Sequence, residues 1–157
     1  MAKKIAVVGL ISDTHGLLRE EAVRALEGSD LIIHAGDVGK PGIIDALQAL
    51  APVVAVRGNI DRGAWASALP MTATAAAGPA SVYVLHDIRQ LEIDPLAEGI
   101  RVVVSGHSHK PGSEERAGVL YVNPGSAGPR RFRLPLTVAR LRLQGSSLTV
   151  DFIELAG

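Results

Sequence analysis

The sequence predicts an α/β fold with a mainly parallel sheet, and two patterns carry this prediction. In the first third of the chain, apolar runs alternate with amphipathic segments, which is the strand–helix order of right-handed crossover units. The C-terminal segment instead alternates apolar with polar residues around a Gly-Ser pair, as an antiparallel hairpin at a sheet edge does. We expect one domain, residues 1–157, because this length suits a single buried core.

Each buried strand is predicted from a short apolar run, the pattern of a strand covered on both faces. The runs are 4–12, 30–37, 52–59, 71–78, 80–86, 100–106 and 118–123. Helical spacing of apolar residues predicts helices over 16–29 and over 40–50, the second opened by Pro41. Residues 88–99 are expected to form a short helix or loop, and 136–145 pairs with 147–155 as the hairpin.

The composition excludes several classes of protein. Hydrophobic residues make up 47% and charged residues 20%, which is typical of a soluble globular protein. The formal net charge is zero without a basic block, which argues against long nucleic acid as a partner. The absence of cysteine excludes disulfides and thiolate metal sites. No run reaches the ~18 apolar residues of a membrane span, and the apolar start meets Asp13 without a cleavage-like site. We therefore expect a cytoplasmic protein that does not enter membranes.

Residues able to bind metal ions follow five of the predicted strands. Ligands of open α/β sheets bind beyond the carboxyl ends of the strands. Taken singly, each residue has a structural explanation, such as a helix cap, a turn or a hydrogen-bonded core histidine. Four of the five histidines lie at strand ends, however, and the separate explanations do not account for that together. The candidate ligands are Asp13, His15, Asp37, Asn59, His86, His107 and His109.

The residue types in this set indicate a transition-metal centre. Imidazole suits manganese, iron, cobalt, nickel or zinc, whereas magnesium and calcium prefer oxygen. Seven ligands are too many for one tetrahedral ion but suit two neighbouring ions that share a bridging aspartate. Two carboxylates against two divalent ions leave a charge of about +2, which favours a phosphate group and the acidification of a bridging water.

Five segments in order, SDTHG, HAGDVG, RGNID, VLHD and SGHSHKP, resemble the motifs of the calcineurin-like metallophosphoesterase superfamily. The family pattern is D-x-H, G-D, G-N, H and G-H-x-H, and the match covers about residues 5–126. The short chain and the segment YVNPGSAGPR (121–130) are similar to the small bacterial and archaeal phosphodiesterase branch. The retromer scaffold subunit of eukaryotes belongs to the same branch.

The resemblance implies a four-layer αββα sandwich of two mixed β-sheets flanked by helices. It implies that Asp13, His15 and His109 bind one ion, that Asn59, His86 and His107 bind the other, and that Asp37 bridges them. Asp37, Asn59 and His86 would thus take part in catalysis through the metals, with a bridging hydroxide attacking phosphorus in line. Manganese is the expected metal, with nickel, cobalt, iron and zinc as alternatives.

Two positions depart from the family pattern. Many members have a histidine directly after the G-N asparagine, where it helps to protonate the leaving oxygen and contacts phosphate. Here that residue is Ile60, which can do neither, so hydrolysis of phosphodiesters is favoured over monoesters. Asp61 is a candidate acid, although we expect it to order the loop instead. Asp87 stands where the family has glycine, and either orients a ligand imidazole or acts as a cap.

Five further residues are candidates for the surroundings of the site. His34 lies within a predicted strand, and we expect it to be a hydrogen-bonded core residue. Asn123 and Ser126 either approach the substrate or form an Asn-Pro-Gly turn. Arg130, with its neighbour Arg131, either contacts the substrate phosphate or is solvated.

The prediction is therefore a dinuclear metal-dependent phosphodiesterase that acts on a small phosphodiester. The alternatives are a non-catalytic scaffold on the same fold and a regulatory module that binds a nucleotide or a partner. A scaffold is free to lose metal ligands, and here all seven positions keep the family's residue types. The edge of the C-terminal hairpin also suggests a homodimer.

Overall fold

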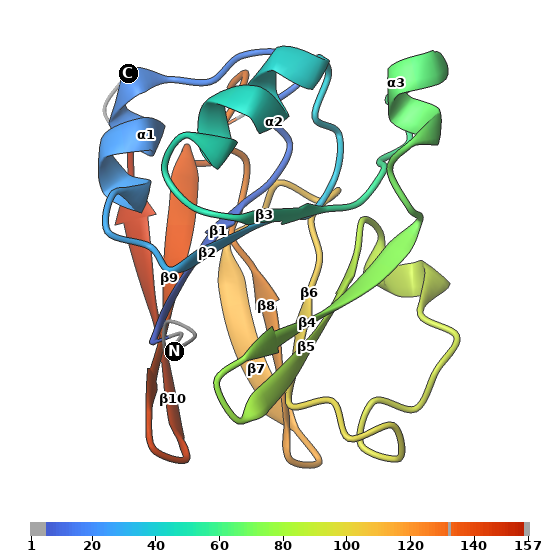
Figure 1. The fold of residues 1–157 in the computed structure, drawn as a ribbon, viewed down its shortest axis with the longest axis vertical. Helices are drawn as coiled ribbons and strands as arrows, with labels where there is room; N and C mark the ends of the chain where they lie inside the picture. Colours follow the sequence, from blue (N-terminus) through green and yellow to red (C-terminus); the bar gives the residue numbers. More distant parts are fainter. Residues whose placement is uncertain (1–5, 132, 156–157) are drawn as a thin grey trace.

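The computed structural model describes residues 6–131 and 133–155, which form two five-stranded mixed β-sheets (Figure 1). The strands are β1 (Val7–Ile11), β2 (Leu31–His34), β3 (Val53–Ala55), β4 (Thr72–Ala77), β5 (Ala80–Leu85), β6 (Val102–Val104), β7 (Gly112–Arg116), β8 (Val119–Asn123), β9 (Thr137–Gln144) and β10 (Ser147–Glu154). The helices are α1 (Glu20–Leu26), α2 (Pro41–Gln48) and α3 (Ala64–Ser67), with one 3₁₀ turn, η1 (Ile88–Gln90).

The first sheet has the strand order β10-β9-β1-β2-β3. β1, β2 and β3 run parallel, whereas β9 pairs antiparallel with both β1 and β10. Helices α1 and α2 are the crossovers between the parallel strands. α1 begins with Glu20 and Glu21 and has Arg24 in its last turn, which complements the helix dipole. α2 begins at Pro41, where the missing N–H costs nothing.

The second sheet has the strand order β4-β5-β6-β8-β7. β5, β6 and β8 are parallel in its centre, and β4 and β7 close the two edges in antiparallel pairing. Both sheets are therefore mixed, as the resemblance implied. The carboxyl ends of β1, β2, β3, β5 and β6 are the strand ends that the candidate ligands follow.

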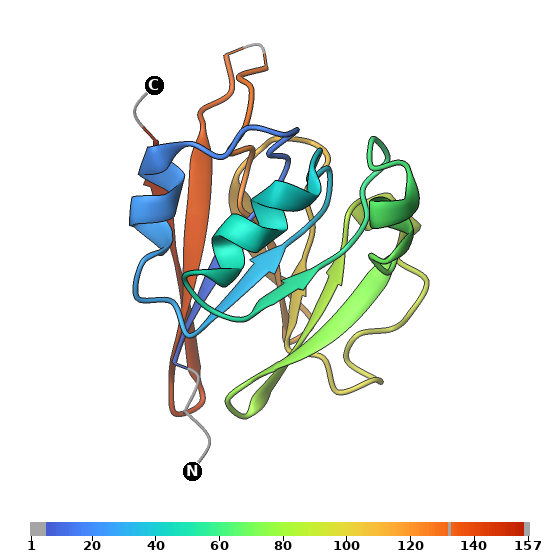
Figure 2. The same ribbon diagram turned by 45° about the horizontal axis from the view of Figure 1, so that its top comes forward.

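Three apolar clusters hold the layers together. The largest lies between the sheets, for example Leu10 and Ile33 against Val82 and Val104. A second cluster lies under α1 and α2, on the outer face of the first sheet (Figure 2). The outer face of the second sheet is covered by the segment 88–100, whose regular structure is the η1 turn. The four-layer arrangement thus has two helices on one outer face and a mostly irregular segment on the other.

The strand predictions are confirmed, with the observed strands shorter than the apolar runs that predicted them. The strand predicted over 4–12 spans Val7–Ile11, with residues 4 and 5 outside the described residues, and the helix predicted over 16–29 covers only Glu20–Leu26. β7 and α3 were not predicted. β7 reads GSEER, is exposed throughout and has no apolar pattern, so its pairing with β8 forms it.

The C-terminal hairpin is confirmed, and β10 is an edge strand. Its successive side chains point to opposite faces of the sheet, and apolar residues pack on both faces. Leu148 and Val150 pack between the sheets, while Ile153 packs under the helices and Phe152 is 38% exposed.

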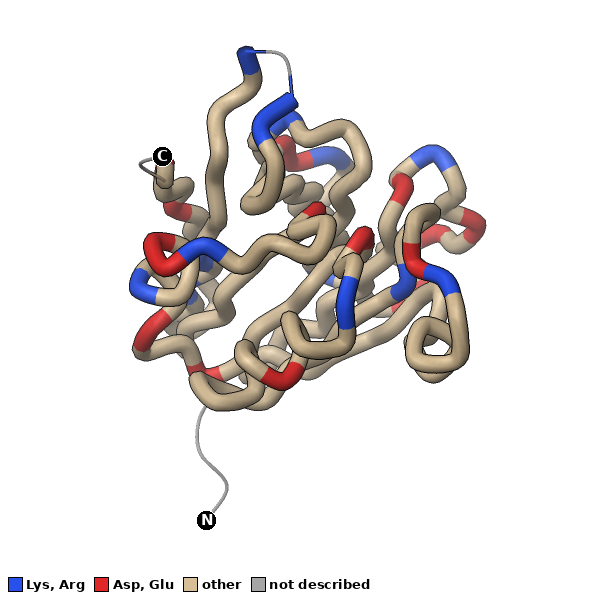
Figure 3. Tube along the Cα trace, turned by 90° about the horizontal axis from the view of Figure 1, so that it is seen from above, with Lys and Arg blue, Asp and Glu red and all other residues tan. Residues whose placement is uncertain are grey.

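Among the described residues, no helix is long and apolar enough to cross a membrane. Among the described residues, acidic and basic positions are interspersed along the chain trace in the view of Figure 3.

Candidate metal centre

The two sheets bring the candidate ligands together from five strand ends. Asp13 and His15 follow β1, Asp37 follows β2, and Asn59 lies in the loop after β3. From the second sheet come the remaining histidines: His86 directly after β5, and His107 and His109 after β6. Parallel strands deliver their carboxyl ends to a common edge, so residues up to 96 positions apart in the sequence become neighbours.

The backbone at this edge adopts a rare conformation. Six described non-glycine residues have positive φ, and five of them are candidate ligands: Asp13, His15, Asp37, His107 and His109. This left-handed conformation costs on the order of 1 kcal/mol or more per residue and persists where the surroundings enforce it, most often at functional sites. The strained positions therefore mark the same edge of the sheets that the motifs mark.

One group of side chains consists of Asp13, His15 and His109, each offering a ligand atom within 4.8 Å of the others. The Asp13 Oδ1 atom lies 3.3 Å from His109 Nε2 and 3.7 Å from His15 Nε2. The other carboxylate oxygen, Oδ2, accepts hydrogen bonds from Ser12 Oγ (2.6 Å) and from the backbone N–H of His107 (3.1 Å). Asp13 is thus held by one oxygen while the other faces the two imidazoles.

The second group is formed by Asp13, Asp37 and His86. Asp37 Oδ2 lies 3.2 Å from His86 Nε2 and 3.4 Å from His15 Nε2, so this single oxygen faces a histidine of each group. The other oxygen, Oδ1, accepts the backbone N–H of Ile60 at 3.1 Å. Asp37 Oδ2 therefore faces a histidine of each group, and Asp13 is a member of both groups, with its Oδ1 atom 3.9 Å from His86 Nε2.

The tautomer of His86 is set by its backbone contact. Its Nδ1 lies 2.8 Å from the carbonyl oxygen of Ala35, which can only accept a hydrogen bond, so Nδ1 carries the proton. In the neutral ring, Nε2 then presents a lone pair to Asp37 and to Asn59 Oδ1, which is 3.0 Å away. A histidine oriented in this way by its second nitrogen is typical of metal ligands.

Several polar atoms at the centre meet acceptors instead of donors. Asp13 Oδ1 and His15 Nε2 are buried without a hydrogen-bond partner among the described residues. The Asn59 amide oxygen faces only acceptors, and the amide would have to turn for its nitrogen to donate to Asp37 at 3.3 Å and His86 at 3.0 Å. Cations between these atoms satisfy all of them at once, so the side chains fit bound metal ions.

The charges at the centre perturb each other strongly in the metal-free protein. Burial raises the pKa of Asp13, but contacts with His109, His15 and Ser12 outweigh it and hold that pKa well below its usual range. The same holds for Asp37, whose pKa His15 and His86 lower against the effect of burial. Conversely, the Asp13 and Asp37 carboxylates raise the pKa of His15 to about 9. Although burial lowers it, the pKa of His86 is raised overall by the same carboxylates.

His107 lies at the rim of the centre and is the most exposed of the candidate histidines, at 36%. Its ring stands edge-on to that of His86, with centroids 5.2 Å apart. Its Nε2 atom faces Asp87 Oδ2 at 3.8 Å and Arg89 Nη2 at 3.2 Å. His107 therefore contacts the other candidate ligands through the His86 ring and is itself partly exposed to solvent.

Two glycines allow the loops to approach each other. A Cβ at Gly58 would overlap the backbone and carboxylate of Asp37, and a Cβ at Gly106 would overlap Ser12 and lie 2.6 Å from Asp13 Oδ2. Each glycine follows a strand and faces an aspartate of the centre. A side chain at either position would separate the loops that hold the candidate ligands.

Asp61 is 6% exposed, and both of its oxygens are engaged by the backbone. Oδ2 accepts the N–H groups of Val38 (3.1 Å) and Gly58 (2.9 Å), and Oδ1 accepts that of Gly39 (2.9 Å). The carboxylate thus ties the loop after β3 to the loop after β2. These contacts favour the loop-ordering role over that of an acid.

His34 is a fully buried, hydrogen-bonded core residue, as expected. Thr14 Oγ1 donates to the Val38 carbonyl oxygen, so it accepts from His34 Nε2 at 3.0 Å, while His34 Nδ1 accepts the Gly36 N–H. Burial lowers the pKa of His34 to about 4, so the ring is neutral. Both nitrogens are used inside the core.

The three residues that the sequence suggested as substrate contacts differ in their burial and in what they contact. Ser126 is 2% exposed and donates to the Asp13 carbonyl oxygen, so it supports the loop and cannot reach a substrate. Asn123 donates to Gly106 O at 3.0 Å and to Ser108 Oγ at 3.1 Å, which braces the loop between His107 and His109. Arg130 is exposed but does not line the two hollows beside the centre.

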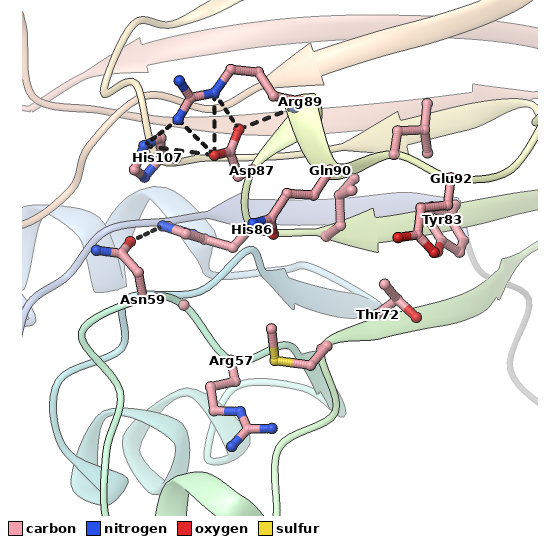
Figure 4. Close-up of a pocket in the computed structure, with 14 residues that line it drawn as sticks. Arg57, Asn59, Thr72, Tyr83, His86, Asp87, Arg89, Gln90, Glu92 and His107 are labelled. Carbon is pink, nitrogen blue, oxygen red and sulfur yellow. Dashed lines mark hydrogen bonds and ion pairs between the residues drawn. The ribbon is translucent and has the colours of Figure 1, made fainter.

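Two hollows open beside the candidate ligands. The first hollow, of about 500 Å³, has Asn59, His86 and His107 at one end and Thr72 and Tyr83 at the other (Figure 4). The second hollow, of about 440 Å³, is lined by Ser108, Lys110, Asn123, Arg131 and Leu134, among others. Asp87, Arg89 and His107 border both hollows.

The model of the calcineurin-like phosphoesterase superfamily domain matches residues 7–146. The chain belongs to this superfamily. It is 33% identical, over 160 aligned positions, to a protein of Methanothermobacter thermautotrophicus named a probable metallophosphoesterase, covering 94% of this chain and 92% of that protein. The superfamily's divalent metal chemistry agrees with the donor atoms gathered at the sheet edge.

Solved structures share the fold at lower sequence identity. Vps29 of Chaetomium thermophilum superposes with a TM-score of 0.81 at 22% identity, covering 96% of this chain and 89% of that chain. A novel archaeal phosphodiesterase superposes with a TM-score of 0.77 at 22% identity, covering 94% and 99%. At this identity the likeness establishes the two-sheet architecture.

One residue beside the centre was missed in the sequence. Arg89 belongs to none of the five sequence motifs, and its position depends on the carboxylate two residues earlier. That residue, Asp87, was noted in the sequence, and it accepts three hydrogen bonds from the Arg89 side chain. It also accepts the Arg89 backbone N–H at 3.0 Å, as the N-cap of η1. The D-x-R spacing at a departure from the family pattern was the available signal.

Proposed function

We propose that the protein is a dinuclear metal-dependent phosphodiesterase. Asp13, His15 and His109 would bind one divalent ion, Asn59, His86 and His107 the other, and Asp37 both. The observation that carries the proposal is Asp37 Oδ2, which lies 3.4 Å from His15 Nε2 and 3.2 Å from His86 Nε2. A carboxylate oxygen that faces a nitrogen of each group is suited to sharing two cations.

The side chains prepare the site for an anionic ester. When bound, two divalent ions would neutralise phosphate charge and acidify a water at neutral pH. The chain contributes the orientation: Ser12 and the His107 N–H fix Asp13, the Ile60 N–H fixes Asp37, and the Ala35 carbonyl fixes His86. Since the pKa of His15 is raised to about 9, this imidazole must release a proton before it can act as a ligand.

Phosphodiesters are the favoured substrate class because no acid stands at the usual position. Ile60 is 39% exposed at the rim and cannot donate a proton. Asp61 is committed to three backbone N–H groups. The leaving alcohol must then be acidic or be protonated by solvent. The fold shared with an archaeal phosphodiesterase supports this substrate class.

The further properties that we propose follow from the same chemistry. Manganese is the expected metal, with nickel, cobalt, iron and zinc as alternatives, because four imidazoles together with two carboxylates suit these ions. We expect a small phosphodiester as the substrate, because a formal net charge of zero argues against the binding of long nucleic acid. We further propose a cytoplasmic location and a homodimer through the β10 edge.

The test is the hydrolysis of bis(p-nitrophenyl) phosphate by metal-stripped protein after manganese, nickel, cobalt or magnesium is added back. We expect turnover with the transition metals and its loss in Asp37→Asn, which keeps the shape but removes the shared charge. Asp45→Asn, at an exposed position of α2, is the matched control and should retain wild-type activity.

Four results would each contradict a part of the proposal. Turnover that is independent of metal, or full activity in Asp37→Asn, would exclude the metal mechanism. Anomalous diffraction showing a single ion in manganese-soaked crystals would exclude the dinuclear centre. Tight metal binding without turnover of any diester would favour the scaffold or regulatory alternative.

A further inference from the structure

Arg89 lies at the boundary between the two hollows, next to a candidate ligand. Its Nη2 atom is 3.2 Å from Nε2 of His107, and Figure 4 shows the guanidinium with Asp87 and His107 at the metal-centre end of the first hollow. Arg57 borders only the first hollow, and Lys110 and Arg131 border only the second. Among the described residues, Arg89 is thus the cation that faces both hollows.

Asp87 holds the guanidinium in this position. Arg89 Nη2 donates to Asp87 Oδ2 at 2.8 Å, and Arg89 Nε donates to Oδ1 at 3.1 Å. The arginine side chain is 74% exposed, and ion pairs so open to water add little to stability. A bidentate pair of this kind does, however, restrict the rotamers of a long side chain and so orients it. The pair therefore serves to place a cation and does little to hold the fold together.

The guanidinium keeps a donor group for a ligand. Nη2 and Nε are directed at Asp87, while Nη1 has no hydrogen-bond partner among the described residues. A planar guanidinium with free N–H groups matches phosphate oxygens, which accept two hydrogen bonds from it. His107 cannot donate to that anion from a nitrogen that binds a metal, so an arginine beside it supplies the missing donor.

The placement between hollows also fits the shape of a diester. A phosphodiester has two ester groups that extend from one phosphorus, and two hollows meet at Asp87, Arg89 and His107. A phosphate at this meeting point has room for an ester group on each side. The same phosphate would lie beside the metal centre, because His107 borders the two hollows and is also a candidate metal ligand.

We propose that Arg89 binds the phosphate of the substrate at the metal centre, with one ester group in each hollow and with Asp87 as the residue that positions the guanidinium. This inference rests on the proposed phosphodiesterase function. It also provides the phosphate contact that Ile60 cannot make, since an arginine on a different loop supplies the positive charge.

The test compares Arg89→Ala and Arg89→Lys with Arg24→Ala. Arg24 is a matched control, because it is an exposed arginine of α1, pairs with Glu20 at 3.6 Å and lines neither hollow. Loss of a charge-assisted contact to phosphate predicts a fall in kcat/KM for bis(p-nitrophenyl) phosphate of about 10- to 100-fold in Arg89→Ala. Inhibition by inorganic phosphate should weaken by a similar factor. Arg89→Lys should recover part of both, because lysine keeps the charge without the planar fork.

Isothermal titration with manganese separates binding of phosphate from support of the metal. Arg89→Ala should bind as many manganese ions as wild type, and with no lower affinity, because the guanidinium competes with a cation for His107 instead of assisting it. Loss of manganese in proportion to activity would overturn the proposal, since Arg89 would then act through the ligand alone. Wild-type kcat/KM and phosphate inhibition in Arg89→Ala would overturn it as well.

Titration of inorganic phosphate into the manganese-loaded protein tests Arg89 even without turnover. If wild type hydrolyses no diester, the proposed function fails. In that case, weaker phosphate binding in Arg89→Ala than in Arg24→Ala would still support Arg89 as the phosphate contact. Equal phosphate binding in the two variants would overturn it.

Discussion

The Asp61 carboxylate joins two loops of the metal centre, and its removal should cost measurable stability. In Asp61→Ala, the buried N–H groups of Val38 and Gly58 lose their acceptor, and the half-buried N–H of Gly39 loses its own. A buried donor left unsatisfied costs about 1–3 kcal/mol, so the two buried groups predict about 2–6 kcal/mol. For a domain of this size that lowers Tm by roughly 5–20 °C.

Asp61→Asn should have an intermediate effect, because the amide oxygen can replace only one carboxylate oxygen. Placed at Oδ2 it keeps the bonds from Val38 and Gly58, but the NH₂ group then faces the N–H of Gly39. Because these two donors face each other without an acceptor, the free energy of unfolding should fall by about 1–3 kcal/mol. Urea denaturation of the metal-free protein measures both variants, with Asp45→Ala at an exposed position of α2 as the control.

The two roles of Asp61 differ in their dependence on the leaving group. A loop-ordering carboxylate predicts that Asp61→Asn lowers activity equally on diesters with aryl and with alkyl leaving groups. A general acid predicts that only the alkyl diester is affected, since p-nitrophenolate leaves without a proton. Wild-type stability in both variants together with selective loss of the alkyl activity would refute the loop-ordering role.

Three further outcomes are expected. The pKa of His15 is about 9 in the folded protein against an ordinary value of 6.5, so protonated His15 stabilises the metal-free protein fully below pH 6.5, and this stabilisation is lost as the pH rises through 9. Because a metal ion must displace that proton, manganese affinity measured by calorimetry should increase from pH 6 to 9. An affinity that does not change over this range would contradict the argument. Gly58→Ala should abolish manganese binding because its Cβ overlaps Asp37, whereas Gly42→Ala, with open space in α2, should leave binding intact and add about 0.5–1 kcal/mol of stability. Ile60→His should increase hydrolysis of an alkyl phosphomonoester relative to bis(p-nitrophenyl) phosphate, and an unchanged ratio would show that the missing acid does not limit the reaction.

Local sequence patterns predicted the strands well because burial on both faces leaves a direct trace in composition. The runs that became β2 and β6, LIIH and VVV, have every residue buried. β7 left no such trace, since its residues are all exposed and only its pairing with β8 makes it a strand. The helix predicted over 16–29 was too long at its start, because His15 and Gly16 form a turn and residues 17–19 have no regular structure, so α1 begins at Glu20.

The candidate ligands were predictable because each follows a strand, and strand ends converge for topological reasons alone. What each one contacts was not predictable. Asp37 faces both His15 and His86 because β2 lies between neighbours of its own sheet while β5 approaches from the other sheet. Ser126, for which the sequence left open a substrate contact or a turn, is buried and donates a hydrogen bond to the Asp13 carbonyl oxygen.

By itself the sequence determined which candidate ligands follow which strands, most of the order of strands and helices, and the isoleucine at position 60, since these are properties of local residues. Only the tertiary structure showed what these side chains contact: Asp37 Oδ2 faces His15 and His86, Asp61 accepts hydrogen bonds from two loops, and Arg89 lies beside His107. These roles depend on distances between residues from different strands, and the packing of two sheets sets those distances.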